Sequence, residues 1–348
     1  MERPSAGIRT TFFFGAGASA ALTDEPVLSS NLLALALKRP PPACPQDDLE
    51  RLQSLVTFLS GNGAGRSVPP TDEVLSLIEA CIDDDIALGG QWDVVNLQQA
   101  RRSLVSLIYH FVEHVVHASG GIADGASSAP DQNPFVRMIR SWPKDSRVAA
   151  VSLNWDCLFE NTYAQIAACN GTIDYGIALK GHDCRPYVAN SDALLVLKPH
   201  GSLSWGECTL CGMLLLETPP YRAVEALPCV SCGVGRIRTV LVPPTFRDTR
   251  RPWYLDAIWA RVEEEIRESD RLIFVGYSLP PQDLDARIHL LRGFRQRRPD
   301  RKVEIEVVFR EHDEGTGIER ERYTSIFGGI PGARLSFFGT GMREWLHD

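Results

Sequence analysis

The sequence predicts an α/β fold, in which a Rossmann-like, doubly wound parallel sheet carries a helical insertion and a small four-cysteine ribbon. Three observations predict this class. Short apolar runs that end in small or polar residues alternate with helical segments, as in parallel sheets flanked by helices. A long stretch in the first half of the chain has helical periodicity and almost no strand signal. Two Cys-x-x-Cys pairs then stand close together in the second half.

The composition is that of an ordinary globular protein. The 348 residues are enough for one large core with a satellite domain, or for two domains. The net charge of −8 argues against a general nucleic-acid-binding surface, so direct nucleic-acid binding is not expected. No apolar stretch reaches the roughly 18 residues of a membrane span. Residues 1–5 lack the layout of a signal peptide, and we expect a cytoplasmic protein with no membrane partner.

The first predicted strand, Thr10 to Phe14, leads directly into a glycine turn. Its β-branched and aromatic residues are typical of a buried strand. The turn reads Gly15-Ala16-Gly17-Ala18-Ser19, and its glycines allow a close backbone approach that a side chain would block. Amides at the start of a helix in this position bind anions such as phosphate. The third glycine of the dinucleotide motif is missing, so nucleotide binding and a purely structural tight turn both stay open.

The helical insertion is predicted over residues 31–145. Its expected helices span residues 28–39, 47–59, 71–82 and 94–118. Three prolines end the first helix, and Thr71-Asp72-Glu73, which follows two prolines, suits the N-terminal cap of the third. A linker rich in Gly, Ser, Ala and Pro follows at residues 119–130.

Beyond the insertion, strands and helices alternate again. The expected strands span residues 148–152, 194–198, 271–275, 303–309 and 334–338, and helices are expected at 255–268 and 283–294. Ligands of such sheets bind at the carboxyl ends of the strands, which is where Gly15, Asn154, His200 and Gly276 fall. We therefore assign residues 1–30, 146–206 and 241–348 to a Rossmann-like domain, 31–145 to the insertion and 207–240 to the ribbon.

The ribbon contains four of the nine cysteines, Cys208, Cys211, Cys229 and Cys232. Their spacing lies within the C-x₂-C-x₁₅₋₂₀-C-x₂-C pattern of zinc sites. Four thiolates suit a closed tetrahedral site with no open position for catalysis, so we expect a structural zinc ion. Unliganded or redox-active cysteines are the alternative.

The order of the motifs resembles that of sirtuins, and in particular a divergent bacterial branch of sirtuin-like NAD hydrolases. The matching motifs are Gly15-Ala16-Gly17-Ala18-Ser19, Asn154-Trp155-Asp156, Lys198-Pro199-His200-Gly201-Ser202, the four-cysteine ribbon and Gly276-Tyr277-Ser278. The resemblance covers residues 10–30 and about 147–348, and the helical insertion lies outside it.

The resemblance implies a role in NAD cleavage for each matching residue. Four residues of the glycine turn would hold the NAD pyrophosphate: Gly15, Ala16, Gly17 and Ser19. Two more would line the adenosine side: Gly276 and Ser278. Asn154 would contact the nicotinamide ribose or order a water, Asp156 would bind the nicotinamide carboxamide, and His200 would act as general base. Cleavage needs an amide to aim the nucleophile and a base whose pKa is near the operating pH.

Each of these side chains also has a purely structural interpretation. Asn154 and Asp156 would suit a turn or a helix cap, and His200 would suit the end of a strand.

Three departures from the protein deacylases favour plain NAD hydrolysis to nicotinamide and ADP-ribose. Deacylases carry Gln where this chain has Leu153, Thr where it has Tyr277, and Pro-Asp-Phe-Arg where it has residues 26–29. The resemblance then implies an effector of bacterial antiphage defence, acting as a homo-oligomer or with a partner ATPase or sensor protein. An NAD-dependent lysine deacylase and a non-catalytic nucleotide-sensing or assembly module are the alternatives.

A second histidine motif lies in the insertion. Residues 110–114 match the inverted zinc-peptidase pattern H-x-x-E-H, and His110, His114 and His117 share one helical face. No helix further along the chain stands out as the source of a third ligand, so a polar helix face is the interpretation we favour. The acidic run at 83–85 and the basic clusters at 247–251 and 295–298 are expected to be solvated surface, although the first basic cluster could also face a partner or the mouth of the NAD site.

Overall fold

The computed structural model describes residues 7–22, 28, 30–61, 67–118, 133–143, 146–166, 172–181, 185–216, 228–242, 252–310 and 316–346. Seven parallel strands form the main sheet in the order β10-β9-β8-β1-β2-β4-β3. They are β1 (Arg9–Phe14), β2 (Arg147–Ser152), β3 (Ile173–Asp174), β4 (Leu194–Leu197), β8 (Arg271–Val275), β9 (Val303–Val308) and β10 (Ala333–Phe338). The predicted α/β class with a doubly wound parallel sheet is confirmed.

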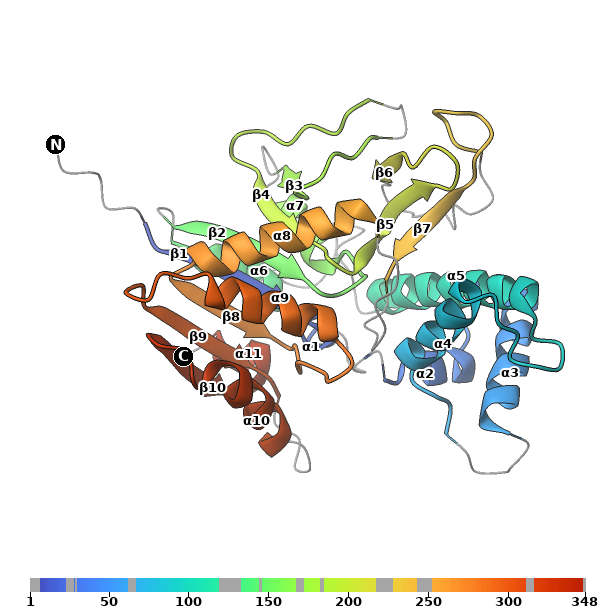
Figure 1. Ribbon diagram of the computed structural model, residues 1–348, viewed down its shortest axis with the longest axis horizontal. Coiled ribbons are helices and arrows are strands. Elements are labelled where there is room, and N and C mark those ends of the chain that lie inside the picture. Colours follow the sequence, from blue (N-terminus) through green and yellow to red (C-terminus); the bar gives the residue numbers. More distant parts are fainter. Residues whose placement is uncertain are drawn as a thin grey trace.

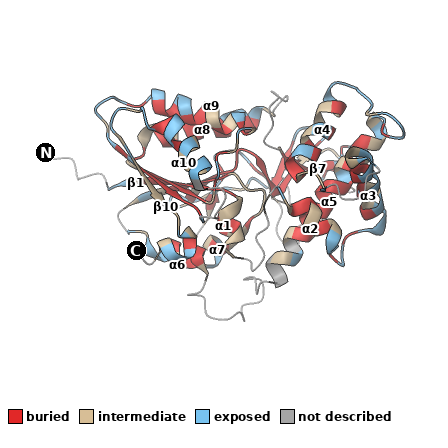
Figure 2. Cartoon of the chain, turned by 90° about the horizontal axis from the view of Figure 1, so that it is seen from below, coloured by how far each residue is buried: buried red, intermediate tan, exposed pale blue. Residues whose placement is uncertain are grey.

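Helices cover both faces of this sheet (Figures 1 and 2). Figure 2 shows α8, α9 and α10 on one face and α1, α6 and α7 on the other. The helices are α1 (Ala16–Ala20), α6 (Pro134–Ser141), α7 (Leu158–Ile166), α8 (Trp253–Glu268), α9 (Leu284–Arg295), α10 (Thr316–Phe327) and α11 (Gly341–Trp345). Because helices enclose the centre of the sheet, β1, β2 and β8 are runs of buried residues after their first one or two positions, whereas β9 and β10 nearer the edge carry polar residues such as Glu304 and Arg334.

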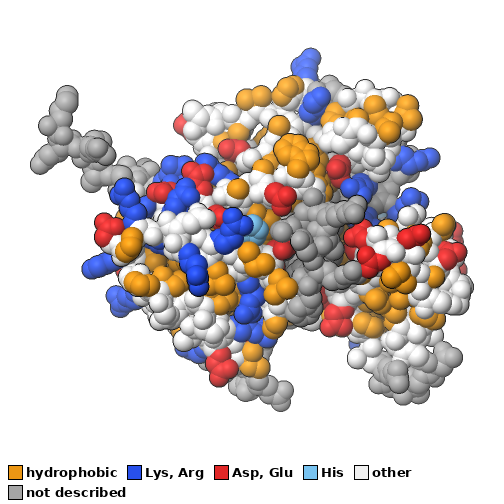
Figure 3. Space-filling model, in the orientation of Figure 1, with side chains coloured by type: hydrophobic (Ala, Val, Ile, Leu, Met, Phe, Trp, Pro, Cys, Tyr) orange, Lys and Arg blue, Asp and Glu red, His pale blue; other side chains and the backbone are white. Residues whose placement is uncertain are grey.

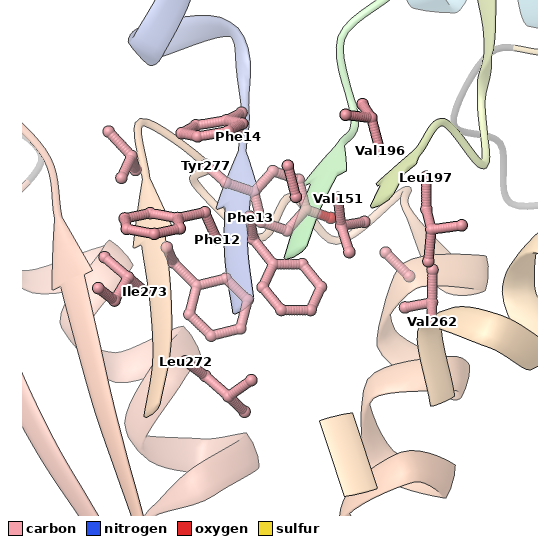
Figure 4. Packing of buried hydrophobic residues seen from close by; sticks show 14 of the residues in the cluster. Phe12, Phe13, Phe14, Val151, Val196, Leu197, Val262, Leu272, Ile273 and Tyr277 are labelled. Atoms are coloured by element: carbon pink, nitrogen blue, oxygen red, sulfur yellow. The ribbon is translucent and has the colours of Figure 1, made fainter. Parts of the chain in front are cut away.

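The aromatic run of β1 lies at the centre of the main core. Phe13 is 1% exposed, and its ring stacks on Phe274 of β8 with ring centroids 4.6 Å apart. Phe14 faces the other helical layer, where it contacts Phe159 of α7 and Phe135 of α6. Figure 4 shows Phe12, Phe13 and Phe14 of β1 between the side chains of the neighbouring strands, among them Val151 and Ile273. β1 therefore contributes buried side chains to the packing on both faces of the sheet.

The insertion has a hydrophobic core of its own, beside the main sheet (Figure 1). Its helices are α2 (Leu32–Lys38), α3 (Gln46–Ser60), α4 (Thr71–Asp83) and α5 (Val94–Ala118). Their fully buried residues include Leu33, Leu52 and Leu75. Helix α6 precedes the end of the predicted insertion, yet its Phe135 and Met138 belong to the core of the sheet.

A three-stranded antiparallel sheet connects the two cores. It consists of β5 (Gly201–Cys208), β6 (Leu214–Leu216) and β7 (Ile237–Leu241), in the order β6-β5-β7. Leu203 and Leu241 reach into the insertion core, while Trp205 and Val240 belong to the main core. We did not predict these strands from the sequence, because β5 mixes glycines and serines with only a few apolar residues.

Some expectations fall outside the described residues. These are the 119–130 linker, the basic cluster at 247–251 and most of the 26–29 segment. None of the helices in the described ranges combines the length and the apolar character that crossing a membrane requires.

The position of Phe13 generates a stability prediction. Phe13→Ala removes a fully buried ring, and we expect the free energy of unfolding to fall by about 3–5 kcal/mol. Urea unfolding followed by circular dichroism measures the change. Phe58→Ala is the matched control because Phe58 is 42% exposed in the insertion, and its effect should be much smaller. Equal losses for the two variants would contradict the central role of Phe13.

Candidate active site and zinc ribbon

The predicted site residues all lie just beyond the carboxyl ends of β1, β2, β4 and β8. The strand register brings these ends to one edge of the sheet, because Phe14 pairs with both Ser152 of β2 and Val275 of β8. Val151 of β2 in turn pairs with Leu197 of β4. Strand β1 lies at the point where the chain's path reverses direction across the sheet, which is where open α/β sheets bind ligands.

The glycine turn after β1 packs backbone to backbone on the turn after β8. The amide of Gly15 donates to the carbonyl of Val275 at 3.0 Å, and that of Gly17 donates to the carbonyl of Gly276 at 2.9 Å. Gly276 has φ +61°, and a Cβ atom there would lie 2.2 Å from the amide nitrogen of Ala18. No side chain fits at this crossing. The amides of Gly15 and Gly17 thus hold the two turns together.

Ser19, Asn154 and Asp156 form one hydrogen-bonded cluster beside this turn. The Asn154 Nδ2 donates to the Gly15 carbonyl and to the Ser19 Oγ, both at 2.9 Å. The Ser19 hydroxyl donates to the Asp156 Oδ2 at 2.7 Å. The other carboxylate oxygen of Asp156 accepts from the amide of Leu158 at 3.0 Å, just inside the start of α7. Three residues expected to contact NAD therefore meet in space although 135 positions separate Ser19 from Asn154.

A buried ion pair lies beneath this cluster. The Lys198 Nζ is 2.6 Å from the Glu160 Oε1, and the two side chains are 0% and 4% exposed. Lys198 also donates to the backbone carbonyl of Asp156. Burial raises the pKa of the Glu160 carboxyl and outweighs the opposing effect of Lys198. Lys198 therefore joins the loop after β2 and the start of α7 to the loop after β4, two residues before His200.

His200 belongs to a second cluster, with Asp283 and Tyr277. The His200 Nε2 lies 3.1 Å from the Asp283 Oδ2, and the Tyr277 hydroxyl donates to the same oxygen at 2.7 Å. The Asp283 Oδ1 accepts from the amide of Ala286 at 3.2 Å and so caps α9. All three members of the cluster are buried, with His200 and Asp283 each 2% exposed.

The charge state of Asp283 follows from these neighbours. Burial by itself raises the pKa of its carboxyl, but His200 and the Tyr277 hydroxyl together outweigh burial and hold this pKa below its ordinary value. An ionised carboxylate can only accept hydrogen bonds. The Nε2 of His200 therefore carries a proton in this contact, and in the neutral form of the ring the lone pair is on Nδ1.

The last two predicted contacts follow β8. Gly276 is part of the backbone crossing described above. The backbone carbonyl of Ser278 accepts from Arg322, and the residue is exposed. Ser278 thus lies beside the glycine crossing, and no described contact joins it to Asn154 or His200.

Sequence reasoning missed Asp283 and Glu160 as members of the site. Asp283 stands at the predicted start of a helix, where Asp is a common cap, so nothing local set it apart. Glu160 lies within a helix after Asn154-Trp155-Asp156. Lys198 and Tyr277 were inside the quoted motifs, but only their contacts reveal what they hold.

The four ribbon cysteines come together as predicted. Their sulfur atoms all lie within 4.8 Å of one another. Backbone amides of Leu210 and Cys211 point at the Cys208 sulfur, and that of Ser231 points at the Cys229 sulfur, each at 3.4 Å. Such amides stabilise thiolates, and four thiolates at this spacing fit a tetrahedral zinc ion. Each pair is followed by a glycine with positive φ, Gly212 and Gly233.

The described side chains of the α5 histidine motif form no comparable group. Among the described residues, the four cysteines are the only group of three or more His, Cys, Asp and Glu side chains close enough to share a metal ion. His110 contacts the ring of Tyr109. The side chains of Glu113 and His117 lie outside the described part of the chain.

Comparison with known proteins gives similarity only among solved structures. No protein-family model and no curated protein matches the chain. A Sir2 homologue mutant in complex with 2'-O-acetyl ADP ribose is 15% identical over 97% of this chain and 90% of that chain, with a TM-score of 0.44. A Sir2 homologue–NAD complex is 15% identical over 97% and 88%, with a TM-score of 0.43. A structure of a Sir2 enzyme described in terms of mechanism and regulation is 14% identical over 97% and 89%, with a TM-score of 0.40.

The ribbon generates a prediction for metal content. We expect one zinc ion per chain by elemental analysis of the purified protein, and none in the Cys208→Ser/Cys211→Ser variant, because two of four thiolate ligands are gone. Cys44→Ser/Cys81→Ser is the matched control, since both residues are buried cysteines of the insertion. Zinc retained by the ribbon variant, or lost from the control, would contradict the assignment.

The buried ion pair generates a prediction for stability. Lys198→Met leaves the Glu160 carboxyl buried without its cation, and we expect the free energy of unfolding to fall by about 3–5 kcal/mol. In the Lys198→Met/Glu160→Leu double variant no charge is left uncompensated, so part of the loss should be recovered. Denaturant unfolding of the single and double variants measures this. Strictly additive losses would show that the two side chains are not coupled.

Proposed function

We propose that this protein is a sirtuin-like NAD glycohydrolase that cleaves the nicotinamide–ribose bond of NAD. The proposal depends above all on the cluster of Ser19, Asn154 and Asp156 at the carboxyl edge of the sheet, against the glycine turn. These are the residues for which the motif resemblance implies contact with NAD. His200, the candidate base, extends from the next strand along the same edge.

The chemistry requires few groups, and this edge of the sheet offers each of them. The bond between the ribose C1' and the nicotinamide nitrogen breaks, its electron pair stays on nicotinamide, and an oxocarbenium-like ribose remains. Water then adds at C1' and loses a proton, which gives ADP-ribose. In this proposal Asn154 aims the water, Asp156 holds the nicotinamide carboxamide, and His200 accepts the proton.

The glycine turn would bind the pyrophosphate mainly through its shape. The amides of Gly15 and Gly17 are already bonded to the turn after β8, so they set the path of the backbone. Ala16 and Ser19 would then lie against the phosphates, and Gly276 and Ser278 would line the adenosine side. All the expected ligand residues thus keep a role, Gly15 and Gly17 in shaping the turn and the others in contact with NAD.

Two local features favour hydrolysis over deacylation. Leu153 takes the place of the deacylase Gln, and it packs on the main core while its amide donates to the Phe14 carbonyl at 2.9 Å. Tyr277 takes the place of a Thr, and its hydroxyl is committed to Asp283. Neither residue offers the polar group of the deacylase motif to a ligand. We therefore propose water, and not an acyl-lysine, as the acceptor.

The biological role follows from the same resemblance. We propose an effector of bacterial antiphage defence in the cytoplasm that depletes NAD when activated, as a homo-oligomer or with a partner ATPase or sensor protein. The helical insertion has its own core and lies outside the sirtuin-like motifs, which makes it the natural place for such assembly.

The activity can be tested directly by nicotinamide release. We expect the full chain to convert NAD to nicotinamide and ADP-ribose, and Asn154→Ala to lose at least about 100-fold in turnover, because it removes the amide that positions the water. Chromatography of both products measures this, with and without an acetylated peptide. Gln98→Ala, an amide removed from the exposed face of α5, is the control and should keep full activity.

The possible results separate the alternatives. Nicotinamide release that requires the peptide and gives O-acetyl-ADP-ribose would identify a deacylase. NAD binding by calorimetry without turnover, in the resting and the assembled protein, would identify a non-catalytic sensing module. Neither binding nor turnover in any assembly state would overturn the proposal.

A further inference from the structure

We propose that Asp283 is the positioning residue that fixes the tautomer of His200, and that the helical insertion holds Asp283 in place through Asp72 and Gln282. The inference deepens the proposed function and rests on it for the role of His200. It connects the insertion to the candidate base through adjacent residues, because Gln282 contacts Asp72 of the insertion and Asp283 contacts His200.

The first link is the hydrogen-bond pattern around Asp283. One carboxylate oxygen faces His200 and Tyr277, and the other accepts the Ala286 amide at the start of α9. The helix therefore fixes which oxygen faces the imidazole. With the Nε2 proton committed to this oxygen, the basic lone pair of His200 is on Nδ1.

The second link connects the adjacent residue to the insertion. The Gln282 Nε2 donates to the Asp72 Oδ2 at 3.1 Å, a contact between residues 210 positions apart. Asp72 lies in the first turn of α4 and is 3% exposed, and within the described part of the chain its Oδ1 has no hydrogen-bond partner. Burying a carboxylate costs free energy unless neighbouring groups donate hydrogen bonds to it. Separation of α4 from the 276–283 loop would leave Asp72 without this bond.

The loop between these contacts is under backbone strain. Leu279 has φ +50° and is fully buried, an arrangement that a residue with a side chain adopts at an energetic cost. The Tyr277 carbonyl accepts from the Tyr323 hydroxyl at 2.7 Å on one side, and Gln282 is bonded to Asp72 on the other. A strained loop persists only where its surroundings hold it, so loss of the Asp72 contact should be felt at Asp283.

The insertion also reaches the other loop of the site. Trp155, between Asn154 and Asp156, packs against the insertion core. Its backbone carbonyl accepts from the amide of Leu203, which belongs to the same core. Two of the four loops at the site, those after β2 and β8, thus contact the insertion. A change in its position or assembly would reach Asn154 through Trp155 and His200 through Asp283.

The tautomer of His200 can be observed without NAD. In Asp283→Asn the side-chain oxygen must still accept from the Ala286 amide, so the new NH2 group faces His200. The Nε2 of His200 then has to accept a hydrogen bond, and its proton should move to Nδ1. We expect ¹⁵N-histidine NMR, assigned with His200→Gln, to show the Nε2-protonated form in the natural chain and the Nδ1-protonated form in Asp283→Asn. Turnover should fall at least about 100-fold. An unchanged ¹⁵N pattern would overturn the role of Asp283, whether or not the protein cleaves NAD.

The link to the insertion is tested by a charge exchange. Gln282→Glu places a second carboxylate against Asp72, and we expect turnover to fall about 10-fold, with a changed ¹⁵N signal for His200. Asp72→Asn in the same chain restores a donor–acceptor pair and should restore both readouts. Gln98→Glu, the same change on the exposed face of α5, should alter neither.

Two results would overturn this link: a Gln282→Glu variant that behaves like the natural chain, or a double variant that stays impaired. If the natural chain does not cleave NAD but the ¹⁵N signals respond as expected, the positioning stands and only the proposed function fails.

Discussion

The site depends on the close approach of two backbone turns, one after β1 and one after β8. Gly15 and Gly17 donate their amides to the β8 side, and Gly276 leaves no room for a side chain against Ala18. This crossing fixes the start of α1, and with it Ser19, relative to the 276–283 loop. The hydroxyl of Ser19 then orients both Asn154 and Asp156. Glycine is required at these positions because a Cβ atom would clash with the other turn and separate the two.

A second constraint is electrostatic. Two buried carboxyl groups contact the loop after β4, each beside one basic side chain: Glu160 beside Lys198, and Asp283 beside His200. Lys198 and His200 are only two residues apart, yet the Lys198 ammonium pairs with Glu160 and the His200 imidazole pairs with Asp283. Lys198 has a structural role, because its ammonium donates to the backbone carbonyl of Asp156. In the proposed function the imidazole is the group that acts on the substrate.

The tertiary contacts also give the insertion a role beyond a separate helical domain. Its core includes Leu203 and Leu241 from the antiparallel sheet, and Trp155 from the site loop packs on it. Asp72 adds a polar contact to the 276–283 loop. The ribbon and the insertion lie at the two ends of the same small sheet (Figure 1), and on the face seen in Figure 3 Lys and Arg side chains are interspersed with Asp and Glu. The two additions to the Rossmann-like sheet are therefore joined to each other as well as to the site.

The sequence by itself determined the parallel sheet, the helical insertion and the four-cysteine cluster, because each has a short-range signature: apolar runs that end in small residues, helical periodicity, and paired cysteines at fixed spacing. It also placed Asn154, Asp156 and His200 at strand ends. It did not reveal the strands of the small sheet, where glycine and serine weaken the pattern. Only the tertiary structure decided which partners these residues have. Asp283 and Glu160 look locally like ordinary helix residues, and their roles arise from contacts 83 and 38 positions away in the chain, which no local pattern encodes.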